Sequence, residues 1–296
     1  MSFMYNPFPF DDPKPVNRPE LSKKTIDAVV SGGTPAVAKK FAASVIESAR
    51  ESNRILAFDG YTTVDWKLFL NLVARECRIA GVEFVSIDQN KECFKSGEEI
   101  DNMIDPLLIW DTKIDPTLLY GKIYKGGYEG LLDEVKTKKF EENVMSLKEG
   151  KGKVVAVYGY GCLIPRFRKL YDVKCFFDIT PKTSILRIRG GEYSNIGKER
   201  PDQINRVIRR CYYCDFEIAV CNRRELLHNS AIDFFFLADD PKNIVMMPFE
   251  TFSDICAQLV KYPFRAKPCY LEGVWGGSYM KKLRHLPDNM RNAAWV

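Results

Sequence analysis

Residues 54–81 read RILAFDGYTTVDWKLFLNLVARECRIAG and combine a strand, a turn and a helix. The apolar run from Ile55 to Phe58 ends at Asp59-Gly60. Helical spacing then places three apolar side chains on one stripe: Leu68, Leu72 and Ile79. In open parallel sheets such a turn faces the crevice where ligands bind, and the helix behind it presents free N–H groups to an anion. The segment therefore predicts an α/β fold in which a phosphate can bind after the first strand.

The turn lacks the spacing of a nucleotide-binding P-loop. Such a loop needs Gly, four residues and then Gly-Lys-Ser/Thr, because backbone N–H groups cradle the phosphates, the lysine reaches the terminal ones and the hydroxyl holds Mg²⁺. Counted from Gly60, the three key positions hold Asp65, Trp66 and Lys67. Thr62 and Asp65 instead have the spacing of a capping box, in which the carboxylate satisfies helix N–H groups. The sequence thus predicts a degenerate phosphate loop, with an ordinary capped turn as the alternative.

The same order of strand, turn and helix recurs later in the chain. Residues 153–161 predict a buried strand with a glycine turn, and Pro181 opens a helix. Further predicted elements are strands at 82–88, 173–178, 232–239 and 243–247, a short helix at 163–170 and a closing helix that ends near residue 262. This alternation implies right-handed crossovers. The expected fold class is therefore α/β, a three-layer, doubly wound, mostly parallel sheet.

Two sets of charged residues are candidates for a site. Asp88 ends the second predicted strand at the crevice, where it could serve as a general base, hold Mg²⁺ through water, or simply cap the next turn. Arginines on the helix after Pro181 and on the next helix could form a clamp over a phosphate ester, or a basic solvated face. These arginines are Arg187, Arg189, Arg206, Arg209 and Arg210.

The composition is that of a soluble globular protein, with 46% hydrophobic and 28% charged residues among 296. The net charge of +5 comes from lysines and arginines interleaved with acids, which indicates a solvated surface rather than a nucleic-acid footprint. The sequence has no apolar run long enough for a membrane span and no signal peptide at its start. We therefore expect a cytoplasmic protein that binds neither nucleic acid nor membrane.

The nine cysteines fit a reducing compartment, because they lie in apolar segments rather than in a loop-rich framework. Three thiolates and one imidazole would suit zinc, and the residues with that chemistry are Cys211, Cys214, Cys221 and His228. The run CYYCDFEIAVC, residues 211–221, is mostly apolar and has no Gly or Pro knuckle. We therefore expect buried core cysteines and no metal in this segment.

Changes in composition divide the sequence into three segments. Residues 1–34 predict an extended Pro-rich arm and a short helix, and residues 35–262 predict the α/β domain. From residue 263 the sequence turns to Pro, Gly and Trp-Gly-Gly with little periodicity, which indicates a linker and the start of another domain.

The stretch KVVAVYGYGCLIPRFRKLYDVKCFFDITPKTSILRIRGG, residues 153–191, resembles the uridine kinase and phosphoribulokinase branch of P-loop kinases. Those enzymes have a strand with a glycine turn, a short helix, a strand ending in Asp and a helix with lid arginines. The resemblance implies a P-loop kinase-like fold with these positions at the site: Gly60, Thr62 and Thr63 in the phosphate loop, Asp88 as the catalytic carboxylate, and Arg187 and Arg189 in the lid. The departure at residues 65–67 argues against phosphoryl transfer, because positioning and charge neutralisation supply nearly all of its catalysis.

The tail resembles the opening of type I mannose-6-phosphate isomerases, in which an apolar strand runs into Trp-Gly-Gly and a basic helix. The matching residues are Tyr270, Leu271, Trp275, Gly276, Gly277 and Lys281. Those isomerases are zinc-dependent cupin-like barrels whose metal ligands lie further along the chain. The resemblance implies that this chain is the kinase-like N-terminal part of a bacterial isomerase-like protein, with zinc expected only in the cupin domain.

Three hypotheses remain open. The first is a non-catalytic kinase-like domain of sugar-phosphate metabolism that binds a small phosphorylated sugar or nucleotide, or holds the C-terminal isomerase domain. The second is an active Mg-ATP-dependent nucleoside or sugar kinase, in which Lys67 replaces the P-loop lysine and Asp88 is the base. The third is a dimerisation or docking module whose contact is the N-terminal arm. Arg187, Arg189 and Arg210 are the arginines expected to bind the ligand.

Overall fold

The computed structural model describes residues 19–116, 120–262 and 285. The chain divides into two compact units, one of residues 27–252 and one that joins residues 1–26 with 253–296. The arm expected before residue 19 and the isomerase-like tail expected from residue 263, His285 apart, lie outside the described residues.

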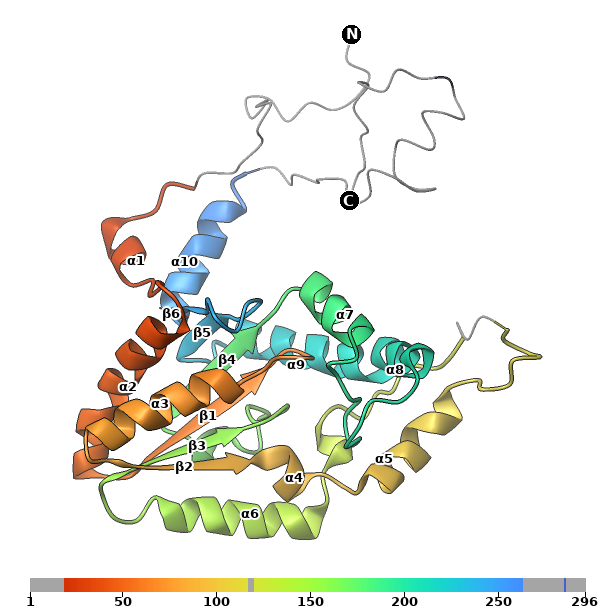
Figure 1. Ribbon diagram of the computed structural model, residues 1–296, viewed down its shortest axis with the longest axis horizontal. Coiled ribbons are helices and arrows are strands. Elements are labelled where there is room, and N and C mark those ends of the chain that lie inside the picture. Colours follow the sequence, from red (N-terminus) through yellow and green to blue (C-terminus); the bar gives the residue numbers. More distant parts are fainter. Residues whose placement is uncertain (1–18, 117–119, 263–284, 286–296) are drawn as a thin grey trace. The chain divides into compact units, whose positions relative to one another are not determined.

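A six-stranded sheet forms the centre of the larger unit (Figure 1). Its strands run in the order β2-β3-β1-β4-β5-β6, and only β6 is antiparallel to its neighbour. They are β1 (Arg54–Gly60), β2 (Glu83–Asp88), β3 (Lys153–Tyr158), β4 (Val173–Asp178), β5 (Phe234–Leu237) and β6 (Val245–Pro248). The expected doubly wound, mostly parallel α/β class is confirmed, with the first strand of the chain in the interior of the sheet.

Helices cover both faces of this sheet (Figure 1). One face is covered by α2 (Thr34–Glu51) and α3 (Lys67–Ile79), which pack against each other, and the opposite face by α6 (Glu134–Leu147) and α9 (Phe216–His228). The remaining helices of this unit are α4 (Gln89–Cys93), α5 (Gly97–Ile104), α7 (Pro181–Arg189) and α8 (Ile204–Arg210), with 3-10 turns at Asp105–Leu107, Glu129–Leu131 and Arg168–Leu170 and a π-helical turn at Cys211–Asp215.

The core on the α2 and α3 face is aromatic. The Phe41 ring lies edge-on to Phe58 of β1 at 5.8 Å between centroids, and Phe69 of α3 lies 5.2 Å from Phe177 of β4. Every residue of β1 after Arg54 is buried, as expected for a central strand with both faces covered. Because side chains alternate along a strand, the residue after Phe58 points to the other face, and that residue is Asp59.

Two expectations were wrong. The short helix expected at 163–170 is a series of turns that ends in one 3-10 turn, since the Phe167 N–H bonds the Ile164 carbonyl and the Arg168 side chain takes the Leu163 carbonyl. The stripe expected on α3 was also misplaced: Leu68 and Ile79 are 37% and 74% exposed, and the buried face carries Phe69, Leu70, Val73 and Cys77. Those residues also recur at helical spacing, so periodicity alone did not identify the face that meets the sheet.

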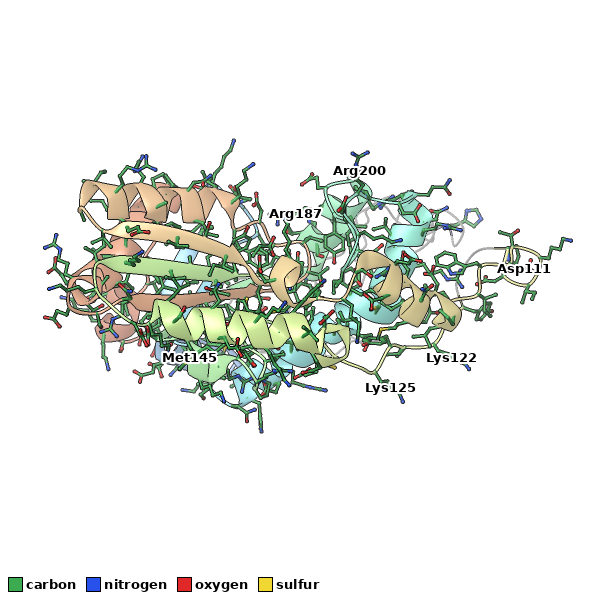
Figure 2. All side chains as sticks on the ribbon, turned by 90° about the horizontal axis from the view of Figure 1, so that it is seen from below. Asp111, Lys122, Lys125, Met145, Arg187 and Arg200 are labelled. Carbon is green, nitrogen blue, oxygen red and sulfur yellow. The ribbon has the colours of Figure 1, made fainter. Side chains whose placement is uncertain are left out.

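An irregular insertion follows α5 and reaches the α8 helix. Asp111, Lys122 and Lys125 lie on it, away from the sheet (Figure 2). The guanidinium groups of Arg206 and Arg209 lie over the Trp110 ring, at 4.7 and 4.8 Å from its centroid, and so attach the insertion to α8.

The smaller unit contains α1 (Lys23–Asp27), except its last residue, and the C-terminal part of α10 (Phe249–Leu259). Within it, the Thr25 hydroxyl donates to the Asp254 carboxylate at 3.4 Å, and the Thr25 N–H donates to the Ser22 hydroxyl at 3.1 Å. In the described part of the chain, no helix has the length and apolar content that crossing a bilayer requires.

Candidate functional site

Asp59 anchors the carboxyl end of the central strand. Its carboxylate is fully buried and accepts four hydrogen bonds: from the N–H groups of Gly60 (2.7 Å), Gly161 (3.0 Å) and Leu163 (2.9 Å), and from the Asn222 amide (3.1 Å). Burial raises the pKa of Asp59 to about 6, although the four donors favour the charged form and lower it in part. The carboxylate thereby holds the turn after β3 and the α9 helix against the end of β1.

The loop after β1 uses its own backbone donors. The Tyr61 N–H donates to the Phe177 carbonyl, the Val64 N–H to the Tyr61 carbonyl, and the Thr63 N–H to the Tyr160 hydroxyl at 3.1 Å. The Lys67 N–H donates to the Asp65 carboxylate at 2.9 Å. Together with Gly60, five N–H groups between residues 60 and 67 therefore have partners inside the protein. Because a P-loop binds phosphate through such groups, phosphate binding by this loop would require some of these bonds to break.

The predicted capping box does not form. The α3 helix begins at Lys67 with Trp66 at its N-cap, and the Thr62 hydroxyl donates to the Asp215 carbonyl at 3.3 Å. Asp65 alone fulfils its expected part, by accepting the Lys67 N–H. The glycine at position 60 serves close packing: a Cβ there would lie 2.6 Å from the Val64 side chain and 3.0 Å from the Phe177 carbonyl oxygen.

Thr63 has a φ of 75°, which is costly for a β-branched residue and persists only where neighbours enforce it. Two side chains of α7 do so. Arg187 donates to the Thr63 carbonyl at 2.7 Å and to the Asp239 carbonyl at 2.9 Å, and Ser184 donates to the Thr62 carbonyl at 3.0 Å. Figure 2 shows Arg187 at this junction. In this structure the predicted lid arginine thus fastens the loop.

The π-helical turn between α8 and α9 also contacts the loop after β1, because the Asp215 carbonyl accepts the Thr62 hydroxyl. Asp215, which is fully buried, accepts from the Tyr193 hydroxyl (2.9 Å) and the Asn195 amide (2.8 Å). Burial raises the pKa of this carboxyl, and nearby Arg210 opposes the rise. Arg210, 3% exposed, donates to the Ile196 carbonyl and pairs with the Asp101 carboxylate. Residues 193–196 are therefore held in place.

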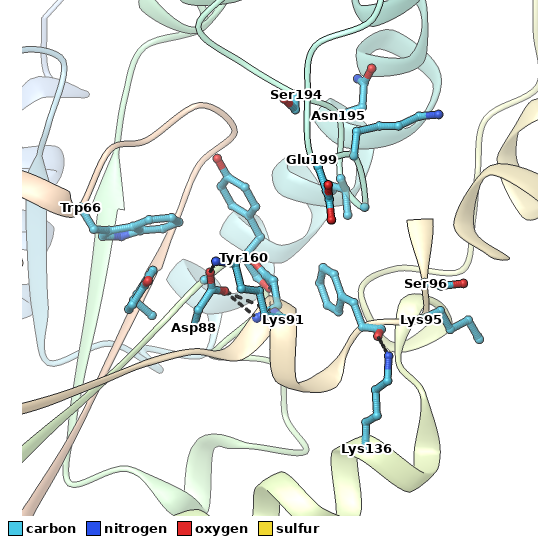
Figure 3. A pocket seen from close by; sticks show the side chains of 17 residues that line it. Trp66, Asp88, Lys91, Lys95, Ser96, Lys136, Tyr160, Ser194, Asn195 and Glu199 are labelled. Carbon is cyan, nitrogen blue, oxygen red and sulfur yellow. Dashed lines mark hydrogen bonds and ion pairs between the residues drawn. The ribbon is translucent and has the colours of Figure 1, made fainter. Parts of the chain in front are cut away.

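A cavity of about 730 Å³ opens beside this loop, at the carboxyl ends of β2 and β3 (Figure 3). Its walls come from α4, the turn after β3, the start of α6 and the segment 194–199. Trp66 and Tyr160 belong both to this wall and to the loop region. Ligands in open α/β sheets bind at this edge.

Lysines dominate the charge of the cavity wall. Four ammonium groups line it, on Lys91, Lys95, Lys136 and Lys198, against two carboxylates, on Asp88 and Glu199. Lys91 lies 3.8 Å from Asp88, and Lys198 pairs with Asp101. Lys95 and Lys136 donate to backbone carbonyls, of Gly130 and Phe94, and neither forms an ion pair with a carboxylate in the described part of the chain. The cavity wall therefore carries two more ammonium groups than carboxylates, although Asp133, which does not line it, interacts with Lys95 and Lys136.

Of the eight residues predicted for the site, only Asp88 lines this cavity. Its carboxylate caps α4 by accepting the N–H groups of Asn90 (3.1 Å) and Lys91 (3.3 Å), the capping alternative weighed from the sequence. Lys67 is exposed on the first residue of α3, and Arg189 is exposed on α7. The binding roles proposed for the other residues, Gly60, Thr62, Thr63, Arg187 and Arg210, stay predictions.

The residues that sequence reasoning missed are Asp59 and the four cavity lysines. Asp59 carried a signal, because it is the one charged residue within an otherwise apolar run. The lysines carried none, because they come from separate segments that only the fold brings together. No cluster of three or more metal-ligating side chains occurs among the described residues. Cys211 and Cys214 are buried, and burial raises the pKa of both thiols.

Comparison with known proteins identifies the family. The family model of a domain of unknown function, DUF8485, matches residues 33–261, well over half of the chain. The chain belongs to this family. No curated protein matches this DUF8485 chain.

Solved structures similar to the DUF8485 chain include three kinases. A putative fructose transport system kinase from Silicibacter sp. TM1040 is 11% identical with a TM-score of 0.40, over 63% of this chain and 94% of that chain. The phosphoribulokinase from Rhodobacter spheroides is 11% identical with a TM-score of 0.38, over 71% of this chain and 94% of that chain. The shikimate kinase from Bacteroides thetaiotaomicron is 14% identical with a TM-score of 0.32, over 79% of this chain and 99% of that chain. Similarity of this degree says nothing of the ligand or activity of the DUF8485 chain.

The raised pKa of Asp59 predicts a pH dependence. The folded value of about 6 lies above the ordinary 3.8, so between these pH values the folded chain holds a proton that the unfolded chain has lost. The contribution of Asp59 to the free energy of unfolding therefore falls as pH rises through this window. We expect the wild-type free energy of unfolding, minus that of Asp59→Asn, to fall by about 2 kcal/mol between pH 4.5 and 7.5 in urea titrations. A difference that stays constant or rises would contradict the account.

Arg187→Ala should loosen the loop. It removes two charge-assisted hydrogen bonds, each worth about 1.5–3 kcal/mol, so we expect hydrogen exchange at residues 61–65 to accelerate at least about tenfold. Mass spectrometry of peptides that cover the loop measures this rate. Arg189→Ala, on the same helix but exposed, is the control and should leave the exchange rate unchanged. Equal rates in the two variants would mean that Arg187 does not fasten the loop.

Proposed function

We propose that this domain binds a small phosphorylated metabolite in the cavity at the ends of β2 and β3, and that it does not transfer phosphoryl groups. The observation that carries the proposal is the set of lysines around a cavity of about 730 Å³ at the ligand-binding edge of the sheet. A phosphate group matches such a wall, because its oxygens accept charge-assisted hydrogen bonds from ammonium groups.

The state of the loop supports the second half of the proposal. Phosphoryl transfer requires groups that cradle the phosphates and neutralise developing charge. Here five of the loop N–H groups have partners inside the protein, Arg187 donates to the Thr63 and Asp239 carbonyls, and Asp88 caps α4. An active kinase would need the loop to rearrange and all these bonds to break, which makes ATP turnover the less favoured alternative.

A sugar phosphate is the first ligand class to examine. The resemblance of the tail to mannose-6-phosphate isomerases motivates this choice, and it also makes an isomerase domain the partner we propose for the native protein. A nucleoside monophosphate shares the phosphate chemistry and is the second class. Neither choice depends on a metal in the described part of the chain.

Removal of two of the four cavity ammonium charges should weaken binding. In Lys95→Gln/Lys136→Gln both charges are lost, while a polar amide that can donate hydrogen bonds remains at each position. Because charge-assisted bonds contribute about 1.5–3 kcal/mol each, we expect the Kd of fructose 6-phosphate, mannose 6-phosphate or UMP in isothermal titration calorimetry to rise at least about tenfold.

The matched control is Lys39→Gln/Lys40→Gln, which removes two exposed charges from α2. It should change the Kd by less than about twofold, because screened surface charges contribute little at physiological salt. An equal loss in both double variants would indicate general charge attraction and overturn the proposed site. Hydrolysis of Mg-ATP above the buffer rate that disappears in Lys67→Ala would overturn the non-catalytic assignment.

A further inference from the structure

The two ends of the cavity differ in chemistry. Figure 3 shows Trp66 at one end and Lys95, Ser96 and Lys136 at the other. The first end is aromatic, and the second carries two ammonium groups that form no ion pair in the described part of the chain. A ligand that fills the cavity would therefore meet a flat apolar surface and a positive charge at separate places.

The aromatic end is rigid. The Trp66 ring lies 5.3 Å from Tyr160 and 6.1 Å from Tyr158 between centroids, in tilted arrangements. Tyr160 is fixed in turn, because its hydroxyl accepts the Thr63 N–H at 3.1 Å and its backbone bonds the Asn90 amide. Aromatic side chains that are already held in place lose little entropy when a ligand stacks on them.

The indole N–H of Trp66 is a buried donor without a hydrogen-bond partner in the described part of the chain. The Trp66 side chain is nine-tenths buried, since the residue is 8% exposed. A buried donor without a partner costs about 1–3 kcal/mol. The indole nitrogen itself is not accessible from the cavity, so Trp66 would take up a ligand oxygen there only after its ring turns.

We propose, on the basis of the function proposed above, that the cavity binds a phosphate ester in one orientation. The phosphate lies at Lys95 and Lys136, and the flat face of the sugar or base lies against Trp66. Trp66 is then the residue that selects esters over free phosphate. A sugar ring and a nucleobase share this chemistry, because each offers a flat face and polar edge atoms.

The test compares inorganic phosphate, fructose 6-phosphate and UMP as probes in calorimetric titrations of the whole chain. In the wild type we expect at least one ester to bind about tenfold more tightly than inorganic phosphate. Trp66→Leu should remove most of that advantage, because stacking on an aromatic ring contributes about 1–3 kcal/mol, and Trp66→Phe should remove a smaller part. Binding of inorganic phosphate should not change in either variant.

Trp110→Phe is the control, since Trp110 also lacks an indole partner in the described part of the chain but does not line the cavity. It should leave all three affinities unchanged. If Trp66→Leu does not fold, as judged by circular dichroism, Trp66→Phe carries the test. An ester advantage that survives in every folded Trp66 variant would overturn the inference and leave the proposed function standing. Absence of binding by all three probes to the wild type would overturn both.

Discussion

The buried carboxylate of Asp59 is the interaction on which the site depends. It lies at the end of the central strand, on the face opposite the aromatic core, and three of its four hydrogen-bond donors come from other segments. These three donors are two backbone N–H groups of the turn after β3 and the side-chain amide of Asn222 on α9. A buried carboxylate without them would be strongly destabilising, so the turn must fold down over the end of β1. Once it does, Tyr160 can reach the Thr63 N–H and line the cavity.

One arrangement therefore accounts for both the closed loop and the neighbouring cavity. Five of the loop N–H groups have partners inside the protein, and α7 and the π-helical turn hold the loop in its strained conformation. The positive charge lies instead one strand away, around the cavity at the ends of β2 and β3. The sheet thus has a cavity at the carboxyl ends of β2 and β3, while the loop after β1 is bonded within the protein.

The sequence predicted the sheet well, because apolar runs bounded by turn residues mark β1, β2 and β4 within a residue or so. It failed at residues 163–170, where the conformation depends on the Arg168 side chain and on the distant Asp59 carboxylate. The predicted site was centred on the loop, since motif spacing locates a phosphate position but does not reveal which donors are already bonded. The cavity lysines could not be grouped from sequence, because their proximity is a property of the packing of α4, α6 and the segment 194–199.

The central claim is that the loop after β1 is closed while the adjacent cavity accepts ligand. Backbone amide chemical-shift mapping on the isotope-labelled chain, with fructose 6-phosphate and with Mg-ATP added separately, tests it most directly. The account predicts that fructose 6-phosphate shifts amides at the cavity wall, around Lys95 and Ile196, and that Mg-ATP leaves the amides of Thr62 and Thr63 unshifted. Saturable shifts at Thr62 and Thr63 with Mg-ATP, and none at the cavity wall with the sugar phosphate, would contradict it.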